Sequence, residues 1–249
     1  MKKFILACSI LISHLAYSQS TNFNDSILHS NKDKFHYKQI IIPSICLAYG
    51  VTSLKVDYLK SLNLELRNEL QENHHSKFGI DDFLQYTPVV AVYGLNMLGI
   101  NGKNRLKERT IKLVTSYVIT SSLVLGLKSW TKVLRPDSTS HNSFPSGHTA
   151  NAFLGAEFLW QEFHDENIWY GIAGYIVASG TGFFRIYNNR HWFSDVVMGA
   201  GIGMLSTKIS YWMYPYLKNK LFRSHKNMNT SIFPMYNRNT LGLGLIMSF

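Results

Sequence analysis

The sequence predicts an all-α protein built as a helical bundle. From Phe83 onward, apolar stretches long enough for helices alternate with short polar joints. Glycine, alanine and serine recur within these stretches, as they do on helix faces that pack closely. A hydrophobic content of 46% supplies enough apolar surface for one large core. The five predicted helices cover residues 83–100, 113–127, 150–160, 168–184 and 196–214.

Residues 1–18 have the three parts of a secretory signal peptide. Two lysines precede an apolar run from Phe4 to Leu15, and Ala16-Tyr17-Ser18 offers the small residues of a cleavage site. We therefore expect export. The alternative is an uncleaved anchor helix, for which the apolar run is short. After cleavage Cys46 would be the only cysteine, which excludes an intramolecular disulfide.

Residues 19–80 are predicted to be a linker followed by an amphipathic helical region. Ile40–Leu54 is apolar but contains Pro43 and Gly50, so we expect it to lie on a membrane or dip into it. Residues 57–73 carry leucines at helical spacing among charges, which predicts a surface-lying amphipathic helix.

The bundle that follows is assigned to residues 81–217, and residues 218–249 to a basic C-terminal tail. In this tail, the turn-like residues 237–240 separate two segments that suggest a small β-hairpin.

The formal charge of +10 favours an anionic partner. Its basic residues are scattered among apolar segments without a recognised nucleic-acid module, so we expect no nucleic acid. The basic stretches 101–109 and 218–226 would be cytoplasmic under the positive-inside rule. If the first bundle helix runs toward the cytoplasm, the candidate site residues described in the following paragraphs lie on the outer side of the membrane. A mean hydropathy near zero leaves a soluble exported protein open.

Lys128 and Arg135 are the first pair of candidate phosphate ligands. They stand seven residues apart, so on one continuous helix that ends at Pro136 they would point the same way. A compact ammonium and a planar guanidinium are complementary ways to hold the oxygens of a phosphate.

The run Pro145-Ser146-Gly147-His148 precedes an apolar, helix-like segment. Ser146 can cap that helix, and Gly147 lets backbone N–H groups approach an oxyanion near the positive end of the helix dipole. His148 would then be placed to protonate a leaving oxygen.

Arg185, His191 and Asp195 form the third group. His191 and Asp195 are four residues apart, so a near-helical path puts them within hydrogen-bond reach. A carboxylate on one ring nitrogen fixes the tautomer and leaves the other nitrogen nucleophilic. Each of these residues alone has an ordinary structural explanation, whereas their order and spacing together favour phosphate chemistry.

These three segments resemble the motifs K-x6-RP, PSGH and SR-x5-H-x3-D of the type 2 phosphatidic acid phosphatase (PAP2) superfamily. The resemblance covers Lys128–Asp195 and implies a membrane-embedded helical bundle that releases phosphate through a phosphohistidine without a metal or cofactor. Phe184 departs from the pattern, because the third motif has Ser before its Arg.

The resemblance also implies a role for each residue. Lys128, Arg135 and Arg185 would hold the phosphate with the backbone at Ser146 and Gly147. His191 would be the nucleophile, His148 the general acid, and Asp195 the residue that orients His191. Five nearby aromatic residues suit an apolar substrate tail and equally suit ordinary packing: Trp130, Phe144, Tyr187, Trp192 and Phe193.

The expected function is a phosphatase of the bacterial envelope, in the inner membrane with its site facing the periplasm. Its substrate would be a lipid phosphate or pyrophosphate of the lipid A phosphate, undecaprenyl pyrophosphate or phosphatidic acid class. The alternatives are a soluble exported nonspecific acid phosphatase, a vanadate-dependent haloperoxidase, and a non-catalytic membrane protein with a degenerate phosphate site. The oligomeric state stays open.

Overall fold

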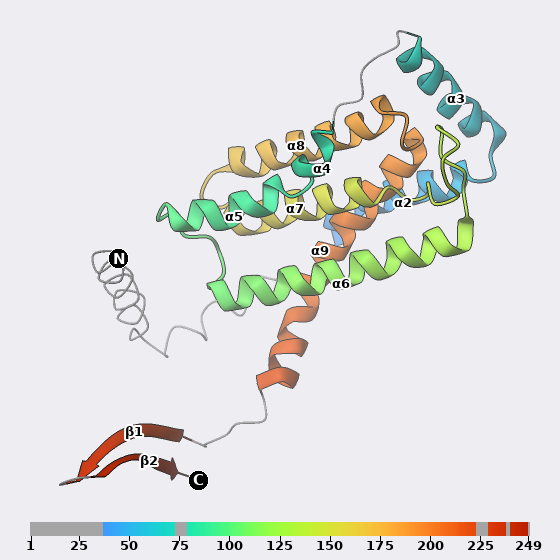
Figure 1. Cartoon of the computed structure of the whole chain (residues 1–249). Coiled ribbons are helices and arrows are strands. Elements are labelled where there is room, and N and C mark those ends of the chain that lie inside the picture. Colours follow the sequence, from blue (N-terminus) through green and yellow to red (C-terminus); the bar gives the residue numbers. More distant parts are fainter. Residues whose placement is uncertain (1–36, 73–78, 223–228, 238–239, 249) are drawn as a thin grey trace, which may run out of the picture. The chain divides into compact units, whose positions relative to one another are not determined.

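The computed structural model describes residues 37–72, 79–222, 229–237 and 240–248 (Figure 1). The predicted signal peptide and most of the predicted linker lie outside these residues. The elements are η2 Tyr37–Ile40, α2 Ile41–Ser53, α3 Asp57–Gln71, α4 Asp81–Leu84, α5 Thr87–Met97, α6 Leu106–Thr131, α7 Gly147–Phe163, α8 Ile168–Tyr187, α9 Phe193–Phe222, β1 Asn229–Asn237 and β2 Thr240–Ser248. The predicted helical bundle is confirmed.

Helix α7 is the centre of the bundle and packs against α5, α6, α8 and α9. Ser146 caps its N-terminus, because the hydroxyl accepts a hydrogen bond from the Thr149 N–H at 3.4 Å. Leu154, Phe158 and Phe163 are fully buried in the main hydrophobic cluster. Burial of each such side chain is worth about 2 kcal/mol, so α7 holds its neighbours in place.

Glycines let α9 approach α7 to backbone contact. A Cβ at Gly199 would lie 2.5 Å from the Ser146 carbonyl oxygen, and one at Gly203 would collide with the Ala150 carbonyl. The predicted close packing through small residues is therefore confirmed. It brings the first turn of α9 beside the start of α7, where the Ser146 N–H donates to the Asp195 carbonyl at 3.0 Å.

Alternating helix directions gather four helix ends in one region, called here the site end. These are the C-termini of α6 and α8 and the N-termini of α7 and α9. The chain between α6 and α7 (residues 132–146) and the chain between α8 and α9 (residues 188–192) form its loops. All three predicted motifs fall on these ends and loops.

The prediction that Lys128 and Arg135 share one helix is wrong. Helix α6 ends at Thr131, and Lys132 has a left-handed backbone with φ 47°. Such a residue terminates a helix, and Pro136 disfavours helical backbone at Arg135. The chain instead folds onto its own loop, with the Arg135 N–H donating to the Ser140 carbonyl at 3.0 Å.

The predicted helix over residues 83–100 is divided into α4 and α5. Pro88 lies in the first turn of α5, where a missing N–H is tolerated and φ suits a helix start. The break leaves α4 as one short turn that ends at Leu84. This short turn carries two aspartates, Asp81 and Asp82, to the site end.

The predicted amphipathic helix is confirmed as α3, and its polar side contacts the end of α8, the loop between α8 and α9, and the first turn of α9. Asn63 Nδ2 donates to Ser194 Oγ at 2.9 Å, and Asn63 Oδ1 accepts from the Ser194 N–H at 3.1 Å. Arg67 Nε donates to Asn189 Oδ1 at 2.9 Å, and Gln71 Nε2 donates to the Tyr187 carbonyl at 2.9 Å. Helix α3 therefore braces the site end.

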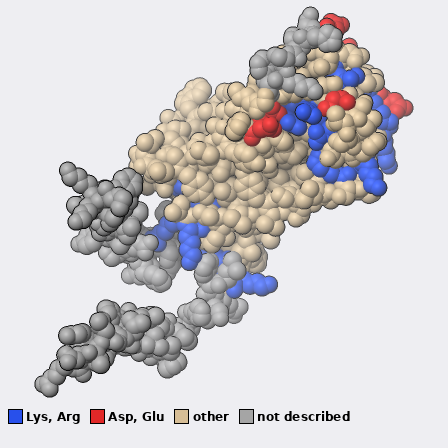
Figure 2. Space-filling model, viewed as in Figure 1, with Lys and Arg blue, Asp and Glu red and all other residues tan. Residues whose placement is uncertain are grey.

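Among the described helices, α6 is long and apolar enough to cross a membrane. Residues 37–53 and 57–71 are long and apolar enough to cross a membrane only when they are taken together, and a 96° bend separates them. Large apolar side chains are exposed on several helices, including Ile42 and Ile45 on α2, Val114 and Val118 on α6, and Ile176 on α8. Figure 2 shows the same pattern on one face, with charged side chains at two ends and an uncharged zone between them.

The predicted C-terminal hairpin is confirmed by an antiparallel pairing of β1 with β2. The register runs from Asn229 opposite Ser248 to Asn237 opposite Thr240. Helix α9 continues through Pro215 to Phe222, so the first residues assigned to the tail are helical.

Candidate active site

His191 and Asp195 lie side by side at the start of α9. His191 Nδ1 is 3.5 Å from Asp195 Oδ2, and both side chains are almost completely buried. The expected proximity is confirmed, although His191 itself precedes the helix, whose first residue is Phe193. The pairing leaves Nε2 as the ring nitrogen directed away from the carboxylate.

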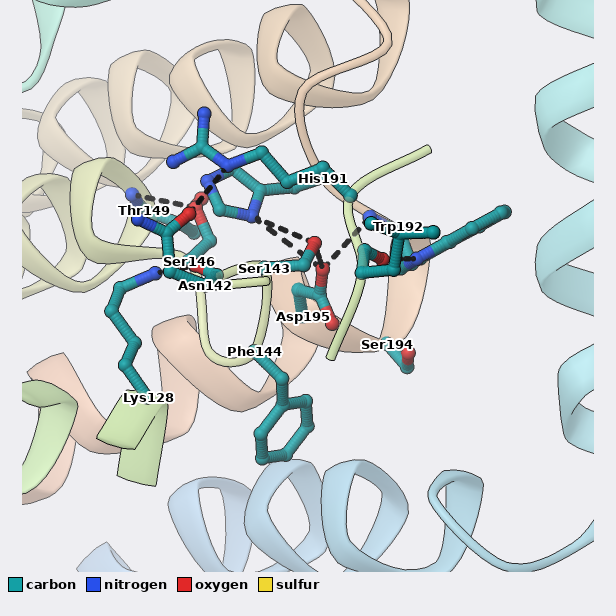
Figure 3. Close-up of polar contacts among 12 residues, drawn as sticks. Lys128, Asn142, Ser143, Phe144, Ser146, Thr149, His191, Trp192, Ser194 and Asp195 are labelled. Atoms are coloured by element: carbon teal, nitrogen blue, oxygen red, sulfur yellow. Dashed lines mark hydrogen bonds and ion pairs between the residues drawn. The ribbon is translucent and has the colours of Figure 1, made fainter. Parts of the chain in front are cut away.

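Asp195 is fixed by residues from both loops of the site end. Its Oδ2 accepts hydrogen bonds from the Ser143 hydroxyl and from the Trp192 N–H, the latter at 2.9 Å. Ser143 Oγ is also 3.5 Å from His191 Nδ1. Figure 3 shows the resulting cluster, with dashed lines joining His191, Ser143, Asp195 and Trp192. Sequence reasoning missed Ser143, although it stands two residues before Pro145.

The His191 ring is neutral at pH 7. Burial is the main cause that lowers the pKa of His191 to about 4, and the positive charges of Arg185 and Lys128 act in the same direction. The hydrogen bond and charge of Asp195 oppose the shift without cancelling it. A neutral ring has a free electron pair, which a nucleophile requires.

Asn142 joins the two cations of the first motif. Its carbonyl accepts a hydrogen bond from Lys128 Nζ, and its Oδ1 accepts from Arg135 Nε at 2.8 Å. Burial, followed by the charge of Arg185, lowers the pKa of Arg135. The cations thus converge through a loop and not through the helix that the spacing predicted.

Arg185 is the buried cation of the site. Its side chain is 8% exposed, and NH1 lies 2.6 Å from Asp81 Oδ2. Its Nε is buried without a hydrogen-bond partner among the described residues. An unsatisfied buried donor costs about 1–3 kcal/mol, so this atom suits an anionic ligand.

His148 contacts a carboxylate that sequence reasoning did not single out. His148 Nε2 lies 2.8 Å from Asp82 Oδ1, and the same oxygen lies 3.8 Å from Arg185 NH1. Asp81 accepts from Asn188 Nδ2 at 3.2 Å in addition to its pairing with Arg185. The signal available in the sequence was a pair of adjacent acids at the start of the bundle in a chain with only 15 acidic residues.

Ser146 and Gly147 begin α7 next to these side chains. A Cβ at Gly147 would lie 3.7 Å from Val124, an ordinary contact, so packing within the described chain does not require glycine there. The first N–H groups of a helix have no partner within the helix and attract anions. The position is therefore suited to an oxyanion.

The five aromatic residues near the site have different environments. Phe144 is buried in a cluster with Val124 and Ala150, which is ordinary packing. Trp130 is 78% exposed, and Phe193 lines a cavity. Trp192 Nε1 donates to the Leu134 carbonyl at 2.9 Å and joins the two site loops. Phe184, in the place of the motif's Ser, packs against Phe183 and Tyr187.

Residues 109–219, which contain every predicted site residue, match the PAP2 superfamily model. The chain carries a PAP2 superfamily domain. Over 153 residues it is 42% identical to a lipid A 1-phosphatase of Porphyromonas gingivalis. The aligned region covers 60% of this chain and 33% of that relative. Over 126 residues it is 31% identical to phosphatidylglycerophosphatase B of Bacillus subtilis, covering 45% and 53% respectively. The chain thus spans between a third and about half of these relatives.

A solved structure supports the PAP2 fold. It is the first transmembrane PAP2-type phosphatidylglycerolphosphate phosphatase from Bacillus subtilis, with a TM-score of 0.51 and 19% sequence identity. The similarity covers 76% of this chain and all of the other chain.

Proposed function

We propose that this protein is a metal-independent phosphatase that hydrolyses a lipid phosphate or pyrophosphate through a phosphohistidine intermediate. The observation that carries the proposal is the state of His191. Its ring is buried and neutral, its Nδ1 lies beside Asp195 and Ser143, and the charges of Arg185 and Lys128 act on it. A neutral imidazole among cations is suited to attack an anionic phosphorus centre.

The phosphate would be bound by Lys128, Arg135 and Arg185. Their three positive charges offset the repulsion between a phosphate dianion and an attacking electron pair. The unsatisfied Nε of Arg185 and the N–H groups at Ser146 and Gly147 would supply further hydrogen bonds.

In the first step, His191 Nε2 forms a bond to phosphorus as the bond to the leaving oxygen breaks. His148 donates a proton to that oxygen, so the lipid leaves as a neutral alcohol or, from a pyrophosphate, as a protonated monophosphate. Asp195 stabilises the positive charge that develops on the His191 ring. Asp195 therefore contributes both orientation and charge.

In the second step, water replaces the histidine. His148 is now neutral and accepts a proton from the attacking water, while the bond between phosphorus and His191 Nε2 breaks. Inorganic phosphate is released and His191 returns to its neutral state.

A cavity beside the site supports a lipid substrate. It has a volume of about 750 Å³, lies between α2, α7, α8 and α9, and is lined mainly by apolar side chains. Ile186 and Phe193 line it near Arg185 and His191, and Lys208 lines it farther along α9. The stretch from Phe193 to Lys208 is about 22 Å long at 1.5 Å per residue, which suits one extended acyl or isoprenoid chain.

The exposed apolar side chains support a location in a membrane of the bacterial envelope. The basic residues 101–109 cover the joint before α6 and its first turn, at the end of α6 away from Lys128, and would be cytoplasmic. The site end would then face the periplasm. A soluble exported phosphatase would have to leave this apolar surface in water.

The test is a substrate panel on the detergent-solubilised full chain. Lipid A, undecaprenyl pyrophosphate, phosphatidic acid and a small aryl phosphate would be compared by release of inorganic phosphate. We expect a lipid to be preferred over the aryl phosphate, and His191→Ala to lose at least ~10³-fold in kcat. His164→Ala is the matched control, because His164 lies at the far end of α7.

Two outcomes would contradict the proposal. Activity that survives His191→Ala would exclude the phosphohistidine route. Equal rates on the aryl phosphate and the lipids, with release of the protein by osmotic shock without detergent, would favour the soluble acid phosphatase.

A further inference from the structure

One carboxylate on α4 contacts both His148 and Arg185. Asp82 Oδ1 lies 2.8 Å from His148 Nε2 and 3.8 Å from Arg185 NH1. The neighbouring Asp81 has a different environment, because its side chain is 2% exposed and pairs directly with Arg185. The Asp82 side chain is 62% exposed, so, unlike Asp81, it is not buried inside the bundle.

We propose that Asp82 is a positioning residue that holds His148 in the orientation and charge state required for proton transfer. This inference rests on the proposed role of His148 as the general acid. The hydrogen bond to Asp82 occupies Nε2, so Nδ1 becomes the ring atom that exchanges a proton with the substrate. Asp82 acts through His148 and makes no bond to the reacting atoms.

The proton transfers balance with this assignment. The imidazolium ring of His148 begins with protons on both nitrogens, and the leaving oxygen takes the Nδ1 proton as its bond to phosphorus breaks. The ring is left neutral with its remaining proton on Nε2, still donated to Asp82. In the second step Nδ1 takes a proton from the attacking water, and the imidazolium is restored.

Three charged groups act on His148. Arg185 on α8 disfavours the protonated ring, whereas Asp82 and Asp81 on α4 favour it. Burial, the largest effect, and Arg185 together keep the pKa of His148 below its ordinary value despite the two aspartates. Removal of the Asp82 charge would therefore lower the pKa of His148 further and shorten the pH range over which it can act as an acid.

Asp82 also places a negative charge beside a phosphate-binding cation. Its distance of 3.8 Å from Arg185 NH1 means that a bound phosphate and the carboxylate would share the same positive charge. Loss of the Asp82 charge should therefore strengthen the binding of inorganic phosphate while it weakens proton donation. A residue with only a structural role would not produce opposite effects on binding and rate.

The experiment uses Asp82→Asn in the full-length protein, because asparagine keeps an oxygen that can accept from Nε2–H and removes only the charge. Asp165→Asn is the matched control, since Asp165 lies 3.2 Å from His164 Nε2 at the far end of α7. The experiment measures three quantities: kcat, the pH profile of kcat/KM, and the inhibition constant of inorganic phosphate. Asp82→Glu tests rescue by a second carboxylate.

We expect Asp82→Asn to lower kcat about tenfold to a hundredfold near neutral pH, to shift the alkaline limb to lower pH, and to tighten phosphate inhibition severalfold. Asp82→Glu should restore the alkaline limb in part, and Asp165→Asn should change none of these quantities. An unshifted alkaline limb in Asp82→Asn would overturn the inference, as would weaker phosphate inhibition together with lower kcat.

A titration of His148 by NMR separates this inference from the proposed function. The inference predicts that Asp82→Asn lowers the midpoint of the His148 titration, whether or not a substrate has been found. An unchanged midpoint overturns it. A wild-type protein inactive on the whole lipid panel would count against the proposed function instead.

Discussion

Asn142 Oδ1 accepts a hydrogen bond from Arg135 Nε at 2.8 Å. The backbone carbonyl of Asn142 also accepts from Lys128 Nζ, so one loop residue fixes two cations that come from a helix and from an irregular segment. Ser140 Oγ donates to the same Oδ1 at 2.8 Å and holds the amide in place. The convergence of these cations depends on this residue.

Replacement of Asn142 by Ala should therefore weaken substrate binding more than it slows the chemical step. Loss of one hydrogen bond to a charged group is worth about 1.5–3 kcal/mol, which corresponds to an increase in KM of roughly tenfold or more. Steady-state kinetics at saturating and limiting substrate would measure the two effects separately. Thr139→Ala in the same loop is the control, and a fall in kcat with KM unchanged would contradict the prediction.

Ser143→Ala should lower kcat with little change in KM. The Ser143 hydroxyl donates to Asp195 Oδ2 and lies 3.5 Å from His191 Nδ1, so its loss loosens the orientation of His191, the proposed nucleophile. A hydrogen bond worth about 1 kcal/mol corresponds to roughly fivefold. Ser129→Ala, which removes a hydroxyl bonded to the Leu125 carbonyl of its own helix, is the control. Equal activity of the two variants would show that Asp195 needs no support from Ser143.

The pH profile of kcat/KM should be bell-shaped with its maximum on the acid side of neutrality. His191 must be neutral to attack, and because its pKa is lowered to about 4, the acid limb should fall near pH 4. His148 must be protonated to donate, and because its pKa is lowered from 6.5, the alkaline limb should fall below pH 6.5. Rates measured from pH 3 to pH 9 on a soluble short-chain substrate would reveal both limbs. A profile that is flat over this range would contradict the assignment.

Ser179→Trp should reduce activity on long-chain lipids and leave short-chain substrates nearly unaffected. Ser179 lines the cavity on α8, and an indole there would occupy the space that we assign to the apolar chain. Ile176→Trp is the control, because Ile176 is on the same helix, 67% exposed, and does not line the cavity. The measurement is KM over a series of phosphatidic acids of increasing chain length. An equal loss of activity at all acyl-chain lengths would show that the acyl chain does not bind in this cavity.

Glu162→Ala should destabilise the bundle by about 3–5 kcal/mol. Glu162 is fully buried, pairs with Arg109 Nε at 3.0 Å and accepts from Asn104 Nδ2 at 2.7 Å, so its loss leaves a buried cation uncompensated. Glu108→Ala breaks the more exposed pair with Lys218 and should cost under about 1 kcal/mol. Thermal unfolding in detergent would compare the two. Similar unfolding temperatures would show that Arg109 finds another partner.

The helices and the order of the motifs were predictable because they depend on local pattern. Apolar stretches separated by short polar joints indicated the bundle, and Ser146 before Gly147 indicated the start of α7. The four-residue spacing of His191 and Asp195 indicated their pairing, which the 3.5 Å distance confirms. The prediction for Arg135 was wrong because its spacing from Lys128 fits a continuous helix, whereas the left-handed backbone of Lys132, which leaves little trace in the sequence, ends that helix.

The sequence by itself determined the helical class, the three motifs, and the candidate residues for phosphate binding and proton transfer. Only the tertiary structure decided which further side chains meet them. Asp82 lies 66 residues from His148, and Ser143 lies 52 residues from Asp195, so no local pattern could reveal these contacts. The physical reason is that backbone packing of α9 against α7 and the short turn of α4 bring distant carboxylates and hydroxyls to one end of the bundle.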